Sequence, residues 1–127
     1  KNEMPTVILF HADWCPWCKK MLAMSWPEIK RTFEDKGYTV IDIETSKTSD
    51  NYDAELVAQH KQYMQGGGVP QIAIVSDNNK VIARFSGFAD AKNVIDELKN
   101  EMHKAQFHAS MAAYGASMAA YYNANSY

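Results

Sequence analysis

The sequence predicts one α/β domain in the order β-α-β-α-β-β-α, with a mixed central sheet and helices on both faces. Short apolar runs rich in β-branched residues alternate with amphipathic stretches of helical periodicity. The polar run SDNN (76–79) joins two such strands over a length typical of a hairpin turn. The chain has 127 residues, 46% hydrophobic and 22% charged, which suffices for one domain with a core but not for two.

The first half of the chain predicts two strands separated by helix. The run PTVILFH (5–11) is short, apolar and β-branched, which indicates a fully buried strand. Pro16 suits a first helical position, where the missing N–H would have no partner, so we expect a helix there. Pro27 should kink or end that helix, and a second helical piece then ends at a glycine. The run YTVIDIE (38–44) predicts the second strand.

A polar loop and a third helix follow. Residues 45–53 are polar and turn-forming, and Asp53 can cap a helix over 54–65 that three glycines end. Strands are predicted at 70–75 and 80–86. Because helical crossovers link the first three strands, we expect those strands to be parallel, with the hairpin adding an antiparallel edge.

The last helix and the tail differ sharply in composition. Residues 90–107 form an amphipathic helical pattern, whereas residues 105–127 contain no Lys, Arg, Asp or Glu. The sequence therefore predicts a domain over 1–104 and a tail over 105–127, in which ASMAAYG is followed by ASMAAYY. A heptad stripe crosses the tail at Phe107, Met111, Tyr114, Met118 and Tyr121. The stripe could pack on a partner, on a second copy or on its own domain, or the tail could be frayed, since a glycine interrupts it.

Charge and hydropathy exclude several functions. The net charge of −2 gives no clustered basic face for nucleic acid. No stretch is long and apolar enough to span a bilayer, and the tail is too weakly apolar for an anchor. Because the chain begins at Lys1, we expect a processed or excised segment from which a targeting signal could have been removed.

The only two cysteines, Cys15 and Cys18, form a CPWC motif at the predicted start of a helix. Unpaired N–H groups and the helix dipole favour negative charge there, so we expect a lowered pKa for the Cys15 thiol. Cys18 lies one turn inside, more buried, and can resolve a mixed disulfide. Lys19 and Lys20 add positive charge that favours the thiolate, although solvent screens exposed lysines. The negative charge of Asp13 acts in the opposite direction and would raise the thiol pKa. The spacing favours a redox pair.

A metal site is the alternative interpretation of the cysteines. His11 lies four residues before Cys15, but a closed zinc site needs a fourth ligand. His60, His103 and His108 lie on helices predicted elsewhere, so we expect no metal. His11 is better read as a packing residue at the rim of the site than as a tuner of the thiolate. No cofactor is required either, because the disulfide itself carries two electrons.

Three motifs resemble the thioredoxin superfamily over about residues 5–102: VILFHAD before WCPWCKK, GGVPQIAIV after a helix, and VIARFSGF. The resemblance implies a thioredoxin fold with Pro70 in the cis form beside the disulfide. It also implies that Val69 offers its backbone to an extended substrate peptide, while Pro70 keeps metal ions from the thiols. Trp14, Pro16 and Trp17 would then form an apolar surface for that peptide.

Several positions depart from the family pattern. The buried acid and lysine of cytoplasmic thioredoxins correspond to Leu9 and Val40, so proton transfer must use water, Asp13, His11 or Asp42. The Pro-Trp pair between the cysteines is similar to glutaredoxins, but their Gly-Gly-x-Asp motif is missing. The interrupted first helix resembles bacterial extracytoplasmic thioredoxin-like domains, including the C-terminal domain of the thiol:disulfide interchange transporter. This favours an extracytoplasmic over a cytoplasmic location.

The leading hypothesis is a thiol–disulfide oxidoreductase that exchanges disulfides with protein substrates and a redox partner protein. Cys15 is the expected nucleophile and Cys18 the resolving thiol, while the direction of electron flow depends on the reduction potential. The alternative is a thioredoxin-fold interaction module, docked into an assembly through its tail or self-associating through residues 107–121.

Overall fold

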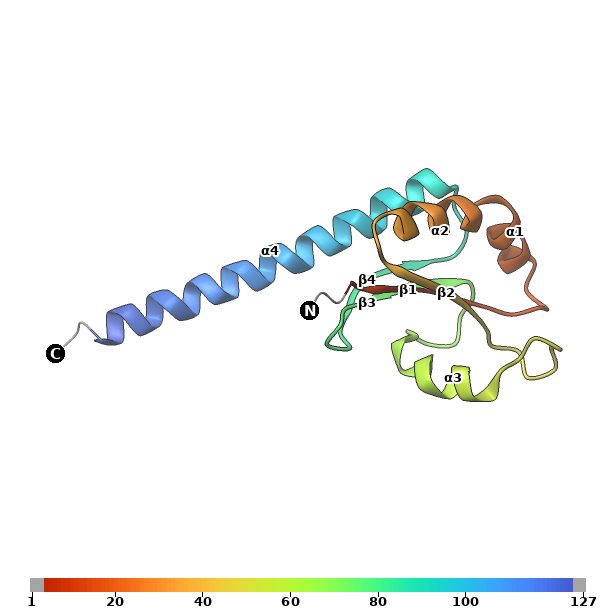
Figure 1. Cartoon of the computed structure of the whole chain (residues 1–127), viewed down its shortest axis with the longest axis horizontal. Coiled ribbons are helices and arrows are strands. Elements are labelled where there is room, and N and C mark those ends of the chain that lie inside the picture. The colour runs from red at the N-terminus through yellow and green to blue at the C-terminus, as the bar shows by residue number, and fades with distance from the viewer. Residues whose placement is uncertain (1–3, 125–127) are drawn as a thin grey trace.

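The computed structural model describes residues 4–124 of the chain (Figure 1). The elements in chain order are β1 (Thr6–His11), α1 (Pro16–Met24), α2 (Trp26–Asp35), β2 (Thr39–Glu44), α3 (Ala54–His60), the 3-10 turn η1 (Lys61–Tyr63), β3 (Gln71–Val75), β4 (Val81–Ser86) and α4 (Ala91–Ala124). Helices α1, α2 and α4 cover one face of the sheet and α3 the other (Figure 1). The predicted fold class, a mixed sheet between two helical layers, is confirmed.

The sheet has the order β2-β1-β3-β4. Strands β1 and β2 are parallel, whereas β3 is antiparallel to both β1 and β4. The expectation that the first three strands are all parallel is therefore wrong for β3. The reason is that α3 is only about 10 Å long, and the chain returns through η1 to the edge where β2 ended. Strand β3 consequently starts beside the end of β1, with Gln71 opposite Phe10.

The central strand β1 supplies side chains to both faces of the sheet. Val7 and Leu9 pack under α1, α2 and α4, while Ile8 and Phe10 pack on the side of α3. Successive residues of a strand point to opposite faces, so a strand covered on both sides must be apolar throughout. This explains the uninterrupted apolar run and fixes the position of the residues that follow His11.

The break between the first two helices lies at Ser25 and not at Pro27. Ser25 is fully buried, and its hydroxyl donates a hydrogen bond of 2.6 Å to the carbonyl of Ala89, just before α4. Pro27 occupies the first turn of α2, where it needs no intrahelical partner. Met21 lies in the core, whereas Met24 is 65% exposed, because it lies in the last turn of α1 where the chain turns away.

Helix α3 is shorter than the predicted 54–65 and tightens into η1 after His60. The predicted cap is present, since the Asp53 carboxylate accepts hydrogen bonds of 3.1 Å from the N–H groups of Glu55 and Leu56. The segment after η1 then leads to Pro70 at the start of β3.

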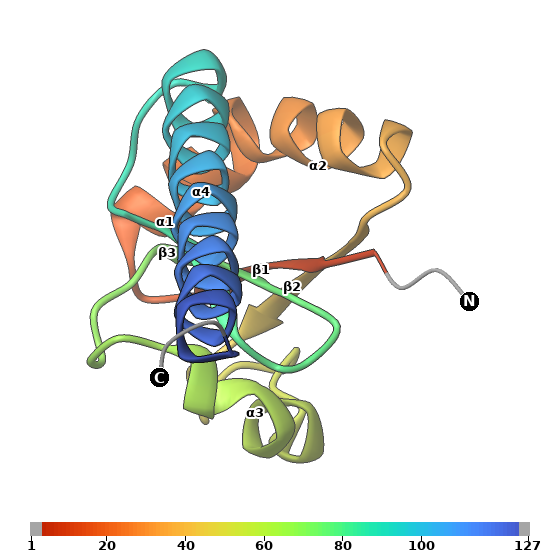
Figure 2. The same ribbon diagram turned by 90° about the vertical axis from the view of Figure 1, so that its left-hand side faces the viewer.

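Helix α4 is one continuous helix of 34 residues that runs far past the sheet (Figures 1 and 2). Its first turns bury Val94, Ile95 and Leu98 against the core, as predicted. The helix continues through Gly115, and Phe107, Met111 and Tyr114 remain 58%, 52% and 62% exposed. The described part of the tail is thus helical. Its start, at Ala105, Gln106 and Ala109, lines a cavity against the domain, whereas the three exposed side chains do not pack on it. Among the described residues, no helix has the length and hydropathy needed to cross a membrane.

Candidate active site

Cys15 ends the turn that leads from β1 into α1, and Cys18 lies in the first turn of α1. The backbone N–H of Cys15 donates to the carbonyl of Ala12 at 3.1 Å, and Cys15 caps the first turn of α1. Cys15 and Cys18 are joined by a disulfide, with their Cα atoms 5.2 Å apart. Cys15 is 3% exposed and Cys18 is fully buried. Cys15 is therefore the more accessible of the two cysteines, although both are buried.

The sulfur of Cys15 lies in an electropositive position. It accepts a hydrogen bond of 3.1 Å from the backbone N–H of Cys18. This N–H is one of the orphan donors at the start of α1, where the helix dipole also favours negative charge. When the disulfide is opened, both features stabilise a thiolate on Cys15.

The segment Val69–Pro70 faces the disulfide from the start of β3, and the peptide bond between these residues is cis. The carbonyl oxygen of Val69 lies 3.6 Å from the sulfur of Cys15. In the disulfide this sulfur carries no proton, so the approach is a contact and not a hydrogen bond. The carbonyl of Pro70 accepts a hydrogen bond of 2.9 Å from Gly87, which ties the segment to the end of β4.

A shallow cavity of about 260 Å³ lies beside the disulfide, lined by Trp17, Val69, Pro70, Gly87 and Phe88. The rings of Trp17 and Phe88 are stacked with centroids 6.0 Å apart. The ammonium of Lys20 lies 5.2 Å from the Trp17 ring and 4.8 Å from the Phe88 ring. Such a cation over aromatic faces holds the rings in place.

The structure brings together only some of the predicted substrate-binding residues. Trp17, Val69 and Pro70 meet around the cavity, whereas Trp14, 67% exposed, and Pro16 do not line it. Phe88 was not identified from the sequence, although it directly follows Gly87, which ends the sheet. The sequence feature that could have identified Phe88 is an aromatic side chain directly after the end of the last strand.

A partly buried polar cluster lies next to the cysteine turn. His11 donates a hydrogen bond of 2.8 Å from Nε2 to the Asp42 carboxylate, and its Nδ1 lies 3.5 Å from Glu44. The other Glu44 oxygen accepts hydrogen bonds from the N–H groups of Asp13, at 3.0 Å, and Ser46, at 2.9 Å. Because β1 and β2 are parallel with His11 opposite Glu44, the cluster anchors the turn that carries Cys15.

The cluster gives Glu44 a structural role, since its side chain is only 6% exposed and accepts two backbone hydrogen bonds. No sequence signal identified this role, because it depends on the parallel register that sets Glu44 beside His11 just before the cysteine turn. Leu9 and Val40, at the positions of the family's acid and lysine, belong instead to the apolar core under α1 and α2.

The hydrogen bond from His11 and the positive charge nearby hold the pKa of Asp42 below its usual value of 3.8. A carboxyl whose pKa is lowered by folding stabilises the protein above its unfolded pKa, and this contribution is lost as the pH falls through the folded pKa. We therefore expect Asp42→Asn to lower the melting temperature near pH 5, and the difference from the wild type to vanish well below pH 3.8. Thermal unfolding followed by circular dichroism across this range tests it; a difference that persists unchanged at the acid end would contradict it.

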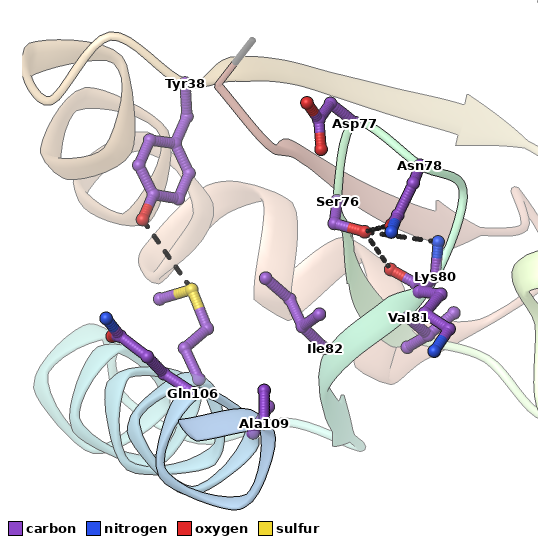
Figure 3. Close-up of a pocket in the computed structure, with 11 residues that line it drawn as sticks. Tyr38, Ser76, Asp77, Asn78, Lys80, Val81, Ile82, Gln106 and Ala109 are labelled. Carbon is purple, nitrogen blue, oxygen red and sulfur yellow. Dashed lines mark hydrogen bonds between the residues drawn. The ribbon is translucent and has the colours of Figure 1, made fainter. Parts of the chain in front are cut away.

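A larger cavity lies at the opposite end of the sheet (Figure 3). It has a volume of about 620 Å³ and lies between the β3–β4 turn, Tyr38 and α4. The Tyr38 hydroxyl points to the sulfur of Met102 at 3.7 Å. No cysteine lines this cavity. Within residues 4–124, no group of three or more His, Cys, Asp or Glu side chains is arranged to hold a metal ion.

Comparison with known proteins agrees with this geometry. The family profile of a thioredoxin-like domain matches residues 1–101. A solved structure described as DsbH oxidoreductase has 19% identity and a TM-score of 0.63, over 80% of this chain and 74% of that one. The reduced C-terminal domain of DsbD from Neisseria meningitidis has 25% identity and a TM-score of 0.58, over 78% and 82% of the two chains.

StoA from Bacillus subtilis has a TM-score of 0.58 and 14% identity, over 74% of this chain and 81% of its own. The comparison with curated sequences finds no significant match. The family profile covers most of the chain, including the cysteine pair and the segment that faces it. This chain belongs to the thioredoxin-like family.

Proposed function

We propose that the protein is a thiol–disulfide oxidoreductase that transfers electrons between protein substrates and a redox partner protein. The observation that carries this proposal is the placement of Cys15. Its sulfur caps α1, accepts the N–H of Cys18 and faces Val69 at 3.6 Å. Among the solved neighbours, one is described as an oxidoreductase and another was solved in reduced and oxidised forms.

In the reducing direction, the Cys15 thiolate attacks one sulfur of a substrate disulfide. The substrate S–S bond breaks, and the leaving sulfur takes its electron pair and then a proton from water. Cys18 next loses its proton and attacks the Cys15 sulfur, which releases the second substrate thiolate and forms the Cys15–Cys18 disulfide. Two electrons move to the substrate in all, and the reverse sequence oxidises a dithiol.

The substrate would lie as an extended peptide along Val69 and Pro70, beside the exposed ring of Trp17. The cavity lined by Trp17 and Phe88 fits an apolar side chain close to the substrate cysteine. Trp14 and Pro16 would contribute on the other side of the disulfide, since both are exposed near it.

The second candidate function is an interaction module, and the exposed extension of α4 favours it. The two functions respond to different changes. Deletion of residues 105–127 should leave disulfide exchange intact and abolish assembly, whereas Cys15→Ser should do the reverse. A protein whose assembly is intact but whose cysteines do not cycle would be an interaction module.

The first measurement is the equilibrium of the Cys15–Cys18 pair against a series of glutathione buffers, followed by tryptophan fluorescence. We expect a reversible two-electron transition. Trp17 lies between the cysteines, so its fluorescence should report whether they are oxidised or reduced. A potential near about −270 mV would identify a reductase, and one near about −120 mV a strong oxidant. The absence of a reversible transition would overturn the oxidoreductase proposal.

A further inference from the structure

The end of α4 carries an apolar stripe that nothing in the described chain covers. We call Phe107, Met111, Tyr114 and Met118 the α4 stripe; the sequence continues the pattern at Tyr121. The first three side chains are each more than half exposed. Side chains of this size on an exposed helix face are uncommon in monomeric proteins, where they indicate a contact surface.

The α4 stripe lies on the side of the helix that faces away from the domain. At about 100° per residue, its four members fall within an arc of about 60°. The same rotation places Val94 and Leu98, which pack on the sheet, almost diametrically opposite. A second helix laid along the stripe would therefore meet neither the sheet nor α2. The stripe is accessible to a long partner without any change in the domain.

Apart from the helix propensity of its alanines, the extension has few interactions of its own that stabilise a helix. It contains no i, i+4 ion pair after Lys104, because no charged residue follows. Gly115 costs about 1 kcal/mol relative to alanine in a helix interior. Most helical stability in proteins comes from packing of an apolar face, and the exposed face of the extension has no such packing within the described chain. A partner on the stripe would supply that packing.

We propose that the partner is a second copy of this chain, and that the two α4 helices pair antiparallel along their stripes. Charge determines the direction. Upstream of Phe107 the same side of α4 carries Lys104 and Glu97, which a parallel pair would bring against their own equivalents. An antiparallel pair centred between residues 112 and 113 sets Phe107 opposite Met118 and Met111 opposite Tyr114, and it brings no charged residue of the other copy against Lys104.

The side chains of the α4 stripe fit this arrangement. Heptad positions alternate between aromatic residues, Phe107 and Tyr114, and the methionines Met111 and Met118. An antiparallel seam pairs each methionine with an aromatic ring of the other copy, which is a favourable sulfur–aromatic contact. With each large side chain burying on the order of 100 Å², the two copies would bury on the order of 1,000 Å². This area is enough for a specific, modest dimer, with the two active sites at opposite ends.

The test is the oligomeric state of the full chain, measured by sedimentation equilibrium from about 10 to 200 μM, a range suited to an interface of this size. We expect a concentration-dependent dimer. Met111→Glu/Tyr114→Glu should weaken it at least about 100-fold, because carboxylates would be buried in the seam. The control is Ala116→Glu, which puts one such carboxylate on the opposite face of the helix and should leave the dimer unchanged. Unaltered redox titration of each variant would show that the domain is folded.

A second double variant, Met111→Lys/Tyr114→Glu, tests whether the two helices pair antiparallel or parallel. In the antiparallel seam the introduced ammonium faces the introduced carboxylate of the other copy, so this variant should dimerise at least about 10-fold more tightly than the double glutamate. In a parallel seam like charges meet and both variants should fail equally. A wild type that stays monomeric throughout, a dimer that survives the double glutamate, or equal failure of both double variants would each overturn the proposal.

Discussion

Replacing Cys15 with serine should reduce disulfide-exchange activity by at least about 1,000-fold, the largest effect expected for any single change. Serine keeps the size of the side chain and can still accept the N–H of Cys18, which lies 3.1 Å from the sulfur. However, a hydroxyl at this site is not ionised at neutral pH and cannot form a mixed disulfide. Reduction of insulin, followed by turbidity, measures the loss. Substantial insulin reduction by the Cys15→Ser protein would show that Cys15 is not the nucleophile.

Cys18→Ser is the matched variant, because it removes the resolving thiol and leaves the nucleophile in place. We expect it to react once with a disulfide and then to remain linked to the substrate through Cys15. Non-reducing electrophoresis after mixing with an excess of substrate would display the covalent complex, and reductant would release it. A complex that forms with Cys15→Ser and not with Cys18→Ser would reverse the two roles. The fully buried position of Cys18 is the reason to expect this difference.

Replacing Glu44 with alanine should lower the free energy of unfolding by about 2–4 kcal/mol. The side chain is 6% exposed and accepts hydrogen bonds from the N–H groups of Asp13 and Ser46. Alanine would leave these donors without their acceptor and would remove the carboxylate beside His11. Because Asp13 belongs to the turn that carries Cys15, the reduction potential should shift as well. Urea unfolding of the oxidised protein measures the stability, and the glutathione titration measures the potential.

Glu44→Gln is the control for this prediction. Its amide oxygen can still accept the two backbone hydrogen bonds, so we expect a loss of less than about 1 kcal/mol. An alanine variant within about 0.5 kcal/mol of the wild type, a difference typical of surface positions, would show that Glu44 does not hold the turn.

Much of the site could be predicted from residues that lie close together in the sequence. A cysteine pair directly after a buried strand and at the first turn of a helix permits few geometries, so the positions of Cys15 and Cys18 followed from the sequence. Asp53 as a cap and the core face of α4 followed in the same way, because each depends on residues a few positions apart. The resemblance to the thioredoxin superfamily pointed to Val69 and Pro70, which lie far from the cysteines along the chain.

Contacts between distant segments were decided only by the tertiary structure. The antiparallel direction of β3 depends on where the chain returns after α3, and helix and strand patterns carry no information about direction. Glu44 anchors the cysteine turn because the parallel register sets it opposite His11. Phe88, after β4, stacks on Trp17 of α1 because the two elements end close together in space. The sequence by itself determined which residues could do chemistry and which helix face was apolar. The tertiary structure decided which residues meet, since spatial proximity depends on how the whole chain packs.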